Sequence, residues 1–119
     1  MAKPTILVTG GAGFIGSALV RRLVQEGHVV RVLDSLYRGD YSRLDGLSKN
    51  LECVDGDVRD LPTVEEAMEG IDEVWHLAAI NGTKNFYEHP DRVLNVGVKG
   101  IVNVLDRVRK QRVRRLFVA

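Results

Sequence analysis

The fold of this chain is decided by residues 5–17, which read Thr-Ile-Leu-Val-Thr-Gly-Gly-Ala-Gly-Phe-Ile-Gly-Ser. The apolar start predicts a strand, and the glycines predict a tight turn into a helix. Gly11, Gly13 and Gly16 satisfy the spacing G-x-G-x-x-G, while Gly10, Gly13 and Gly16 satisfy G-x-x-G-x-x-G. Such a turn lets the backbone approach a pyrophosphate, whose charge faces the N–H groups of the helix start. The stretch predicts either a dinucleotide-binding turn or an ordinary strand-to-helix turn.

The residues after the turn favour dinucleotide binding. A helix is predicted over 14–26, because Ile15 and two later leucines form one apolar stripe. A second apolar strand over 29–33 ends at Asp34, which lies 18 residues after the last glycine of the turn. A carboxylate near this distance is expected to bind the ribose hydroxyls of a dinucleotide.

Composition indicates one cytoplasmic domain over residues 1–119. The chain is 45% hydrophobic and 28% charged, which is typical of a globular domain, and its net charge is +1. This balance indicates neither nucleic acid nor membrane as a partner. Cys53 is the one cysteine, so no internal disulfide is possible and a reducing compartment is favoured. The start lacks the features of a signal peptide, and no apolar run could span a bilayer.

Strands and helices alternate along the rest of the chain. A strand is predicted over 5–9, before the helix and strand described above. A loop follows over 35–50, with one helical turn around Leu44 and Leu47, then a strand over 51–54 and a helix over 61–69 capped by Asp60. The last predicted elements are a strand and its exit over 73–79, a loop over 80–90, a helix over 91–110 and a strand over 116–119. Gly97 and Gly100 fall inside the long helix and are interpreted as sites of close approach to a neighbouring element.

This alternation predicts an α/β fold with a doubly wound parallel sheet. The expected strand order is 3-2-1-4-5, with helices on both faces. The ligand crevice is then expected at the carboxyl ends of the first and fourth strands, where the order reverses. The turn at 10–16, Asp34, Asp57 and the segment 77–79 all follow strands, so we expect them to converge there.

These motifs together resemble the extended short-chain dehydrogenase/reductase family, in its branch of NAD-dependent nucleotide-sugar epimerases and dehydratases. The resemblance is carried by the glycine turn, Asp34, Gly56-Asp57-Val58-Arg59-Asp60, His76-Leu77-Ala78-Ala79, and 100–105 in the long helix. It implies a Rossmann-type cofactor-binding domain.

The resemblance also implies a role for each candidate residue. The turn would hold the pyrophosphate, Asp34 the adenosine ribose, Asp57 and Val58 the adenine, and the segment 77–79 would line the path to the nicotinamide. The cofactor-binding residues expected on this basis are Gly10, Gly13, Phe14, Ile15, Gly16, Asp34, Ser35, Arg38, Asp57, Val58, Leu77, Ala78 and Ala79.

The sequence also departs from the family pattern. The family's asparagine three or four residues before the glycine matching Gly100 is replaced by Val96 or Gly97, and its threonine after that glycine by Ile101. The family's Tyr-x-x-x-Lys pair is missing, because the residues four positions after Tyr37, Tyr41 and Tyr87 are Tyr41, Asp45 and Asp91. A lysine near the tyrosine lowers its pKa for proton transfer.

We therefore expect no catalytic residue in this chain. It is interpreted as the cofactor-binding part of such an enzyme, truncated before the substrate-binding part and inactive alone. The alternative is a non-catalytic dinucleotide-binding or dimerising module that is complete as it stands.

The cofactor expected is NAD rather than NADP. A carboxylate at Asp34 repels a 2′-phosphate, whereas Arg38 is close enough in sequence to accept one, so NADP is the less favoured choice. Asp57 has the alternative role of a turn residue.

Several other polar residues are given structural roles. His76 is interpreted as a hydrogen-bonded core histidine and Cys53 as a small core residue. His28 and His89 have no companions at metal-ligand spacing, so no metal site is predicted.

Two features near the carboxyl end bear on partners. The basic cluster is interpreted as a solvated helix end rather than as a nucleic-acid patch, and consists of Arg107, Arg109, Lys110, Arg112, Arg114 and Arg115. The strand over 116–119 would have an unpaired apolar edge, which offers a pairing surface for a second copy in a homo-oligomer.

Overall fold

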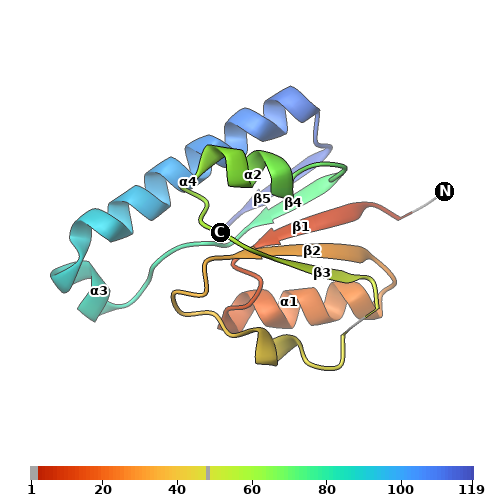
Figure 1. Cartoon of the computed structure of the whole chain (residues 1–119), viewed down its shortest axis with the longest axis horizontal. Helices are drawn as coiled ribbons and strands as arrows, with labels where there is room; N and C mark the ends of the chain where they lie inside the picture. Colours follow the sequence, from red (N-terminus) through yellow and green to blue (C-terminus); the bar gives the residue numbers. More distant parts are fainter. Residues whose placement is uncertain (1–2, 48) are drawn as a thin grey trace.

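The computed structural model describes residues 3–47 and 49–119 (Figure 1). Residues 1–2 and Ser48, which falls in the predicted loop over 35–50, lie outside the described residues. In chain order the elements are β1 (Thr5–Thr9), α1 (Phe14–Gln25), β2 (Val29–Asp34), the 3-10 turn η1 (Tyr41–Leu44), β3 (Leu51–Asp55), α2 (Leu61–Ala67), β4 (Glu73–His76), α3 (Thr83–Glu88), α4 (Pro90–Gln111) and β5 (Arg115–Val118).

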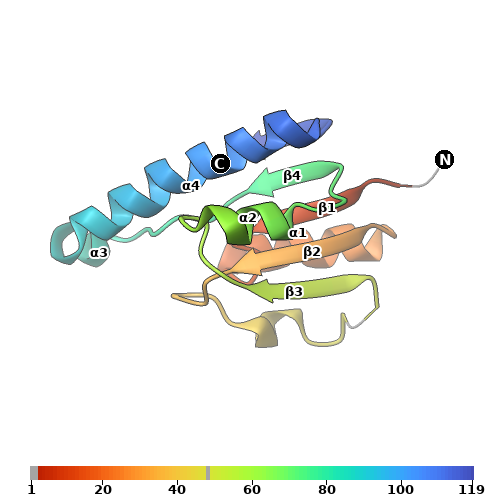
Figure 2. The ribbon, with the colours of Figure 1, turned by 45° about the horizontal axis from the view of Figure 1, so that its top comes forward.

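The strands form one parallel sheet in the order β3-β2-β1-β4-β5, which confirms the predicted α/β fold and strand order. Figure 2 shows β1 between β2 and β4, with the arrowheads at one end of the sheet. Leu7 of β1 is in register with Arg31 of β2 and with Val74 of β4. The strand order therefore reverses at β1 and β4, and the loops that follow them open a crevice there.

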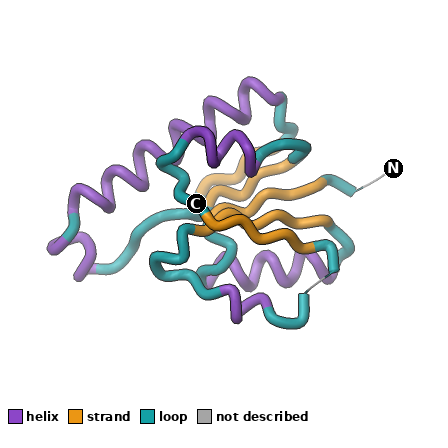
Figure 3. The backbone as a smooth tube through the Cα atoms, viewed as in Figure 1, coloured by secondary structure: helices purple, strands orange, loops and turns teal. Residues whose placement is uncertain are grey.

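Helices cover both faces of the sheet, so the core has two layers (Figure 3). Successive side chains of a strand point to opposite faces. Ile6 and Val8 pack with Val20 of α1, whereas Leu7 packs with Val64 of α2 and with residues of α4. The apolar run of β1 is buried on both sides, as expected for a central parallel strand.

The predicted loop over 80–90 contains a short helix, so that prediction is wrong for 83–88. Helix α3 begins after Gly82, whose φ is 104°, and the Phe86 N–H donates to the Gly82 carbonyl at 3.1 Å. None of the α3 residues is buried. A single helical turn on the surface needs no apolar stripe, and apolar periodicity was the signal used to predict helices.

Two side chains differ from their expected roles. The Asp60 carboxylate makes no capping hydrogen bond to the backbone of α2, because it accepts the Thr63 hydroxyl instead. Cys53 is exposed rather than part of the core. It belongs to β3, an edge strand of the sheet in which no residue is buried.

The two glycines of α4 differ in their surroundings. A Cβ at Gly100 would lie 2.7 Å from Cγ2 of Val58, so Gly100 marks a close approach as predicted. A Cβ at Gly97 would meet no atom within 4 Å, so the same prediction is wrong there. Gly97 lies on the exposed side of α4, which the sequence spacing alone did not distinguish.

Candidate functional site

A cavity of about 750 Å³ opens at the carboxyl ends of the strands. All thirteen residues expected to bind a cofactor line it, although they come from four separate segments of the chain. The lining also includes residues that were not among the expected cofactor-binding residues, namely Leu33, Tyr37, Gly39, Arg43, Gly56, Arg59, Ile80, Asn81, Arg92, Val96 and Ala119.

The glycine turn forms one wall of this cavity. Gly10 has a φ of 73°, which favours glycine, and a Cβ there would lie 3.0 Å from the Ala78 backbone nitrogen. A Cβ at Gly16 would collide with the Gly10 carbonyl oxygen. Helix α1 has no side-chain cap, so the N–H groups of Phe14 and Ile15 in its first turn have no cap acceptor. The turn is therefore a cradle of backbone donors that suits an anion.

Asp34 is held in one orientation at the end of β2. The residue is 8% exposed. Its Oδ2 accepts the Ala12 N–H at 2.9 Å, and its Oδ1 accepts the Leu36 N–H at 2.8 Å. An ionised carboxylate has about four lone-pair positions, so about two remain for further donors. This geometry fits a neighbouring pair of hydroxyl groups.

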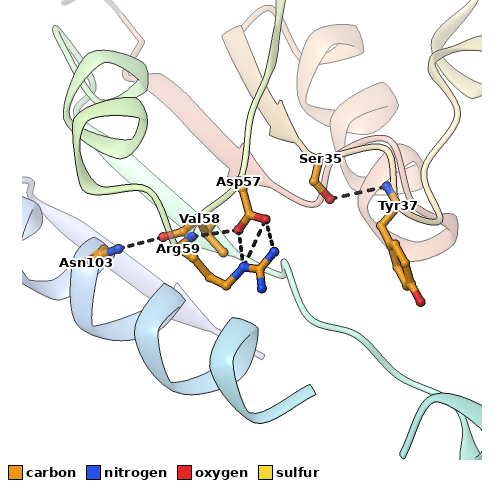
Figure 4. Close-up of polar contacts among 6 residues, drawn as sticks. All are labelled: Ser35, Tyr37, Asp57, Val58, Arg59 and Asn103. Atoms are coloured by element: carbon orange, nitrogen blue, oxygen red, sulfur yellow. Dashed lines mark hydrogen bonds and ion pairs between the residues drawn. The ribbon is translucent and has the colours of Figure 1, made fainter. Parts of the chain in front are cut away.

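The segment after β3 places Asp57 and Val58 beside Asp34, because the Gly56 N–H donates to the Asp34 carbonyl at 3.1 Å. Asp57 accepts the backbone N–H of Arg59 at 2.9 Å, so its expected alternative role as a turn residue is present. It also pairs with the Arg59 guanidinium at 2.7 Å (Figure 4). This hydrogen-bonded pair lowers the pKa of Asp57 below its usual value.

Leu77, Ala78 and Ala79 leave β4 against the glycine turn. The Thr9 hydroxyl oxygen accepts the N–H of Leu77 at 3.0 Å and of Ala78 at 3.1 Å. Thr9, the residue before Gly10, therefore anchors the segment that approaches Gly10 closely at Ala78. These hydrogen bonds fix the exit of β4 beside the glycine turn.

His76 is a core histidine, as predicted. It is buried, and its Nδ1 lies 2.8 Å from the Thr9 hydroxyl. Because that oxygen accepts two N–H groups, we infer that its proton is donated to Nδ1. Burial lowers the pKa of His76 below its ordinary value of 6.5.

Ser35 and Arg38 reach the cavity from the loop after β2. The Ser35 hydroxyl accepts the Tyr37 N–H at 3.3 Å (Figure 4). Arg38 donates from Nη1 to the Asn81 carbonyl at 2.6 Å, across the crevice. Its guanidinium is thus engaged with the segment after β4 as well as lining the cavity.

Three further arginines line the cavity, and sequence reasoning missed them. Arg43 donates to the Ala12 carbonyl at 2.9 Å, Arg59 pairs with Asp57, and Arg92 lies over the Tyr37 ring at 5.0 Å. With Arg38 they outnumber the two aspartates of the lining. Arg59 could have been found from its place beside Asp57, but Arg43 and Arg92 carried no local signal.

Known proteins resemble this chain in sequence and in fold. The family model described as "NAD dependent epimerase/dehydratase family" matches residues 6–119. UDP-N-acetyl-alpha-D-glucosaminuronate decarboxylase of Bacillus cytotoxicus is 33% identical over 117 residues, which cover 98% of this chain and 36% of that protein. dTDP-glucose 4,6-dehydratase of Mycobacterium tuberculosis is 37% identical over 112 residues, which cover 92% of this chain and 34% of that protein.

Solved structures agree with the sequence matches. UDP-glucose 4-epimerase of Thermus thermophilus in complex with NAD has a TM-score of 0.85 and 36% identity, covering 94% of this chain and 36% of that one. An epimerase of Methanothermobacter thermautotrophicus has a TM-score of 0.88 and 33% identity, covering 97% of this chain and 34% of that one.

The chain therefore belongs to the NAD dependent epimerase/dehydratase family. It matches the N-terminal part of these relatives and spans about a third of their length. Across residues 3–47 and 49–119, no helix is long and apolar enough to cross a membrane. The same residues contain no group of three or more His, Cys, Asp or Glu side chains that could hold a metal ion.

Proposed function

We propose that the cavity binds NAD, and that the chain is the cofactor-binding part of a nucleotide-sugar epimerase or dehydratase. The observation that supports the proposal is the convergence of all thirteen expected residues on one cavity. Its volume of about 750 Å³ lies within the usual range of small-molecule and cofactor sites. Relatives from this family include enzymes acting on UDP- and dTDP-sugars, and one solved relative holds NAD.

The residues present fit the cofactor group by group. In the proposed complex, the N–H groups of Phe14 and Ile15 bind the pyrophosphate, and the two free positions of the Asp34 carboxylate accept the ribose hydroxyls. Asp57 and Val58 bind the adenine. When bound, NAD supplies a nicotinamide that takes up and returns a hydride. Leu77, Ala78 and Ala79 shield that end from water, and we propose no proton-transfer residue within this chain.

NAD is proposed over NADP because of Asp34. Both of its oxygens are already oriented by backbone N–H groups, so the carboxylate cannot turn away from a 2′-phosphate without losing those bonds. Arg38 is engaged with the Asn81 carbonyl, which lessens its capacity to offset the repulsion.

Calorimetric titration of the purified chain with NAD and NADP tests this proposal. We expect saturable binding of NAD, weaker binding of NADP, and a loss of at least about tenfold in NAD affinity for Asp34→Ala, because hydrogen bonds to a charged group are lost. Asp45→Ala, at an exposed carboxylate of the neighbouring loop, is the matched control. A folded chain that binds neither dinucleotide, or that binds NADP as tightly as NAD, contradicts the proposal.

A second candidate is a non-catalytic dinucleotide-binding or dimerising module. It is favoured by β5, which pairs with β4 on one side and has no strand partner on its outer side within the described residues. Phe117 and Val118 of this strand are exposed. The unpaired edge suits a strand of a second copy.

A further inference from the structure

Two segments that flank the glycine turn are joined across the cavity. Arg38 donates from Nη1 to the Asn81 carbonyl at 2.6 Å, which links the loop after β2 to the segment after β4. Because β1 lies between β2 and β4 in the sheet, a contact between these two segments must cross the turn that follows β1 (Figure 2). The Arg38 hydrogen bond therefore bridges the cradle of backbone donors at the start of α1.

Tyr37 makes two further contacts from the same loop. Its hydroxyl donates to Oδ1 of Asn85 in α3 at 3.2 Å, and Arg92 of α4 lies 5.0 Å from the centre of its ring. Asn85 also donates from Nδ2 to the Asn81 carbonyl at 3.0 Å, so it connects the Tyr37 contact with the Arg38 contact. We call the contacts of Tyr37 and Arg38 with Asn81, Asn85 and Arg92 the clasp.

The α3 side of the clasp has little packing of its own. No α3 residue is buried, and a second cavity of about 410 Å³ is lined by Phe86 and Tyr87 of α3 and by Val93 of α4. The helix follows Gly82, whose φ is 104°. Segments that bury little apolar surface open locally at a small cost in free energy. This part of the chain can therefore move away from the loop after β2 once the clasp contacts break.

We propose that the clasp closes over a bound dinucleotide and must open for it to enter or leave. The inference rests on the proposed NAD site, because that proposal places the pyrophosphate on the glycine turn that the Arg38 hydrogen bond crosses. It goes further by assigning the rate of cofactor exchange to Tyr37, Arg38 and Asn85. A clasp that is equally closed in the free and the loaded chain slows entry and release by the same factor and leaves the affinity unchanged.

The experiment follows exchange of the reduced cofactor, NADH, with the full 119-residue chain. Trp75 of β4 is the only tryptophan, so energy transfer from it to the reduced nicotinamide reports binding. Stopped-flow mixing gives the entry rate, and displacement by excess NAD gives the release rate. In Tyr37→Phe and Asn85→Ala both rates are expected to rise about threefold or more, the value of one neutral hydrogen bond, while the dissociation constant changes by less than about twofold.

Two further variants separate the clasp from general effects on α3. Tyr87→Phe removes an exposed hydroxyl from the same short helix and is expected to leave both rates unchanged. Arg38→Met removes the bridging hydrogen bond and is expected to raise the release rate by about tenfold or more, because the donor is charged. Circular dichroism establishes that each variant is folded, and Tyr37→Phe decides the question if Asn85→Ala unfolds.

Amide hydrogen exchange in the cofactor-free chain gives a readout that does not depend on binding. The N–H groups of Phe86 and His89 donate within α3 and its end, at 3.1 and 2.8 Å. They are expected to exchange faster in Tyr37→Phe than in Tyr87→Phe, because the first variant loses a contact that holds α3 and the second does not. Equal exchange in the two variants would show that Tyr37 does not hold α3, and would overturn the clasp.

The binding outcomes are also distinguishable. Unchanged entry and release in both Tyr37→Phe and Asn85→Ala overturn the clasp and leave the NAD site standing. Faster release at an unchanged entry rate also overturns it, because the lost contacts would then be contacts to the cofactor itself. An unsubstituted chain that is folded but binds neither NADH nor NAD overturns the proposed function, and this inference with it.

Discussion

Thr9 and His76 form a buried polar pair beneath the cavity. The Thr9 hydroxyl oxygen accepts two backbone N–H groups from the exit of β4, which leaves its proton for Nδ1 of His76. This arrangement requires an unprotonated Nδ1. Burial also disfavours the imidazolium, because the charged ring loses its hydration, so both effects oppose protonation of His76 in the folded chain.

Folding stability is therefore expected to fall as the pH drops below about 6.5. In the unfolded chain His76 takes up a proton near its ordinary pKa of 6.5, whereas in the folded chain its pKa is lowered. The unfolded state then binds more protons, and the free energy of unfolding decreases with falling pH in this range. Denaturant titrations at pH 7.5 and at pH 5 measure the difference.

His76→Asn and His89→Asn provide the test variants. Asparagine at position 76 keeps an acceptor near the Thr9 hydroxyl but does not titrate, so the pH dependence between these two values is expected to flatten. His89 is exposed at the start of α4, and its replacement is expected to preserve the original dependence. An equally steep dependence in His76→Asn would show that another group is responsible.

Among single residues, the candidate site could be predicted well where a motif and a strand end coincided. Asp34 is the last residue of β2 and Asp57 lies two residues after β3, and parallel strands bring their carboxyl ends to one edge. Arg43 and Arg92 were missed, because they reach the cavity from an irregular loop and from the start of α4. Nothing in their local sequence sets the direction of a long, flexible side chain.

Helix α4 illustrates how one element carries two kinds of glycine. Gly100 lies where α4 crosses the Val58 segment, and a Cβ would be 2.7 Å from a methyl group of that buried residue. Gly97 lies three residues earlier, where a Cβ would meet nothing within 4 Å. Glycine at position 100 allows α4 to lie close to Val58. Glycine at position 97 allows no comparable contact.

Gly97→Ala and Gly100→Ala are expected to change stability in opposite directions. Alanine at position 97 is expected to stabilise the chain by about 0.5–1 kcal/mol, because glycine weakens a helix interior. Alanine at position 100 is expected to destabilise it by about 1 kcal/mol, because overpacking against Val58 outweighs the helix propensity gained. Thermal and denaturant unfolding measure both variants.

The two variants serve as controls for each other, since they make the same substitution in the same helix. Equal stabilisation by both would mean that Val58 yields without cost. Destabilisation by Gly97→Ala would mean that its side of α4 is covered in solution, in contrast to its exposure in this structure.

Among the exposed apolar groups of the molecule, two lie on β5 and α4. One is the outer edge of β5, which has no strand partner among residues 3–47 and 49–119. The other is a stripe along α4 that comprises Leu94, Val98, Val102 and Leu105. Contiguous exposed apolar surface favours association, and an open strand edge favours it through backbone pairing.

We predict that the chain self-associates through β5 and that Val118→Lys weakens this association by about tenfold or more. A lysine on an edge strand blunts pairing, and two copies would bring like charges together. Sedimentation velocity over a range of concentrations measures the dissociation constant. The matched variant is Val102→Lys on α4, which is expected to leave association unchanged.

Loss of association in Val102→Lys but not in Val118→Lys would assign the contact to the α4 stripe instead. A chain that is monomeric at all concentrations would contradict association through either surface. The module interpretation would then lose the observation that favours it.

Sequence patterns alone predicted the parallel sheet, its strand order and thirteen of the residues that line the cavity. These follow from local information, because apolar strands alternating with amphipathic helices admit few topologies, and the residues after each strand share one edge. The short helix at Thr83–Glu88 was missed because it buries nothing and so has no apolar period. Cys53 was misplaced because strand hydrophobicity does not distinguish an edge strand from a central one.

The surroundings of each candidate residue depend on tertiary packing. The hydrogen bond from Asn103 to the Val58 carbonyl, and the different surroundings of Gly97 and Gly100, depend on how α4 lies across the sheet. The crossing of a helix is set by the packing of side chains from distant segments, which no local pattern records. Such contacts orient the side chains that line the cavity. The sequence pattern predicts only which residues reach it.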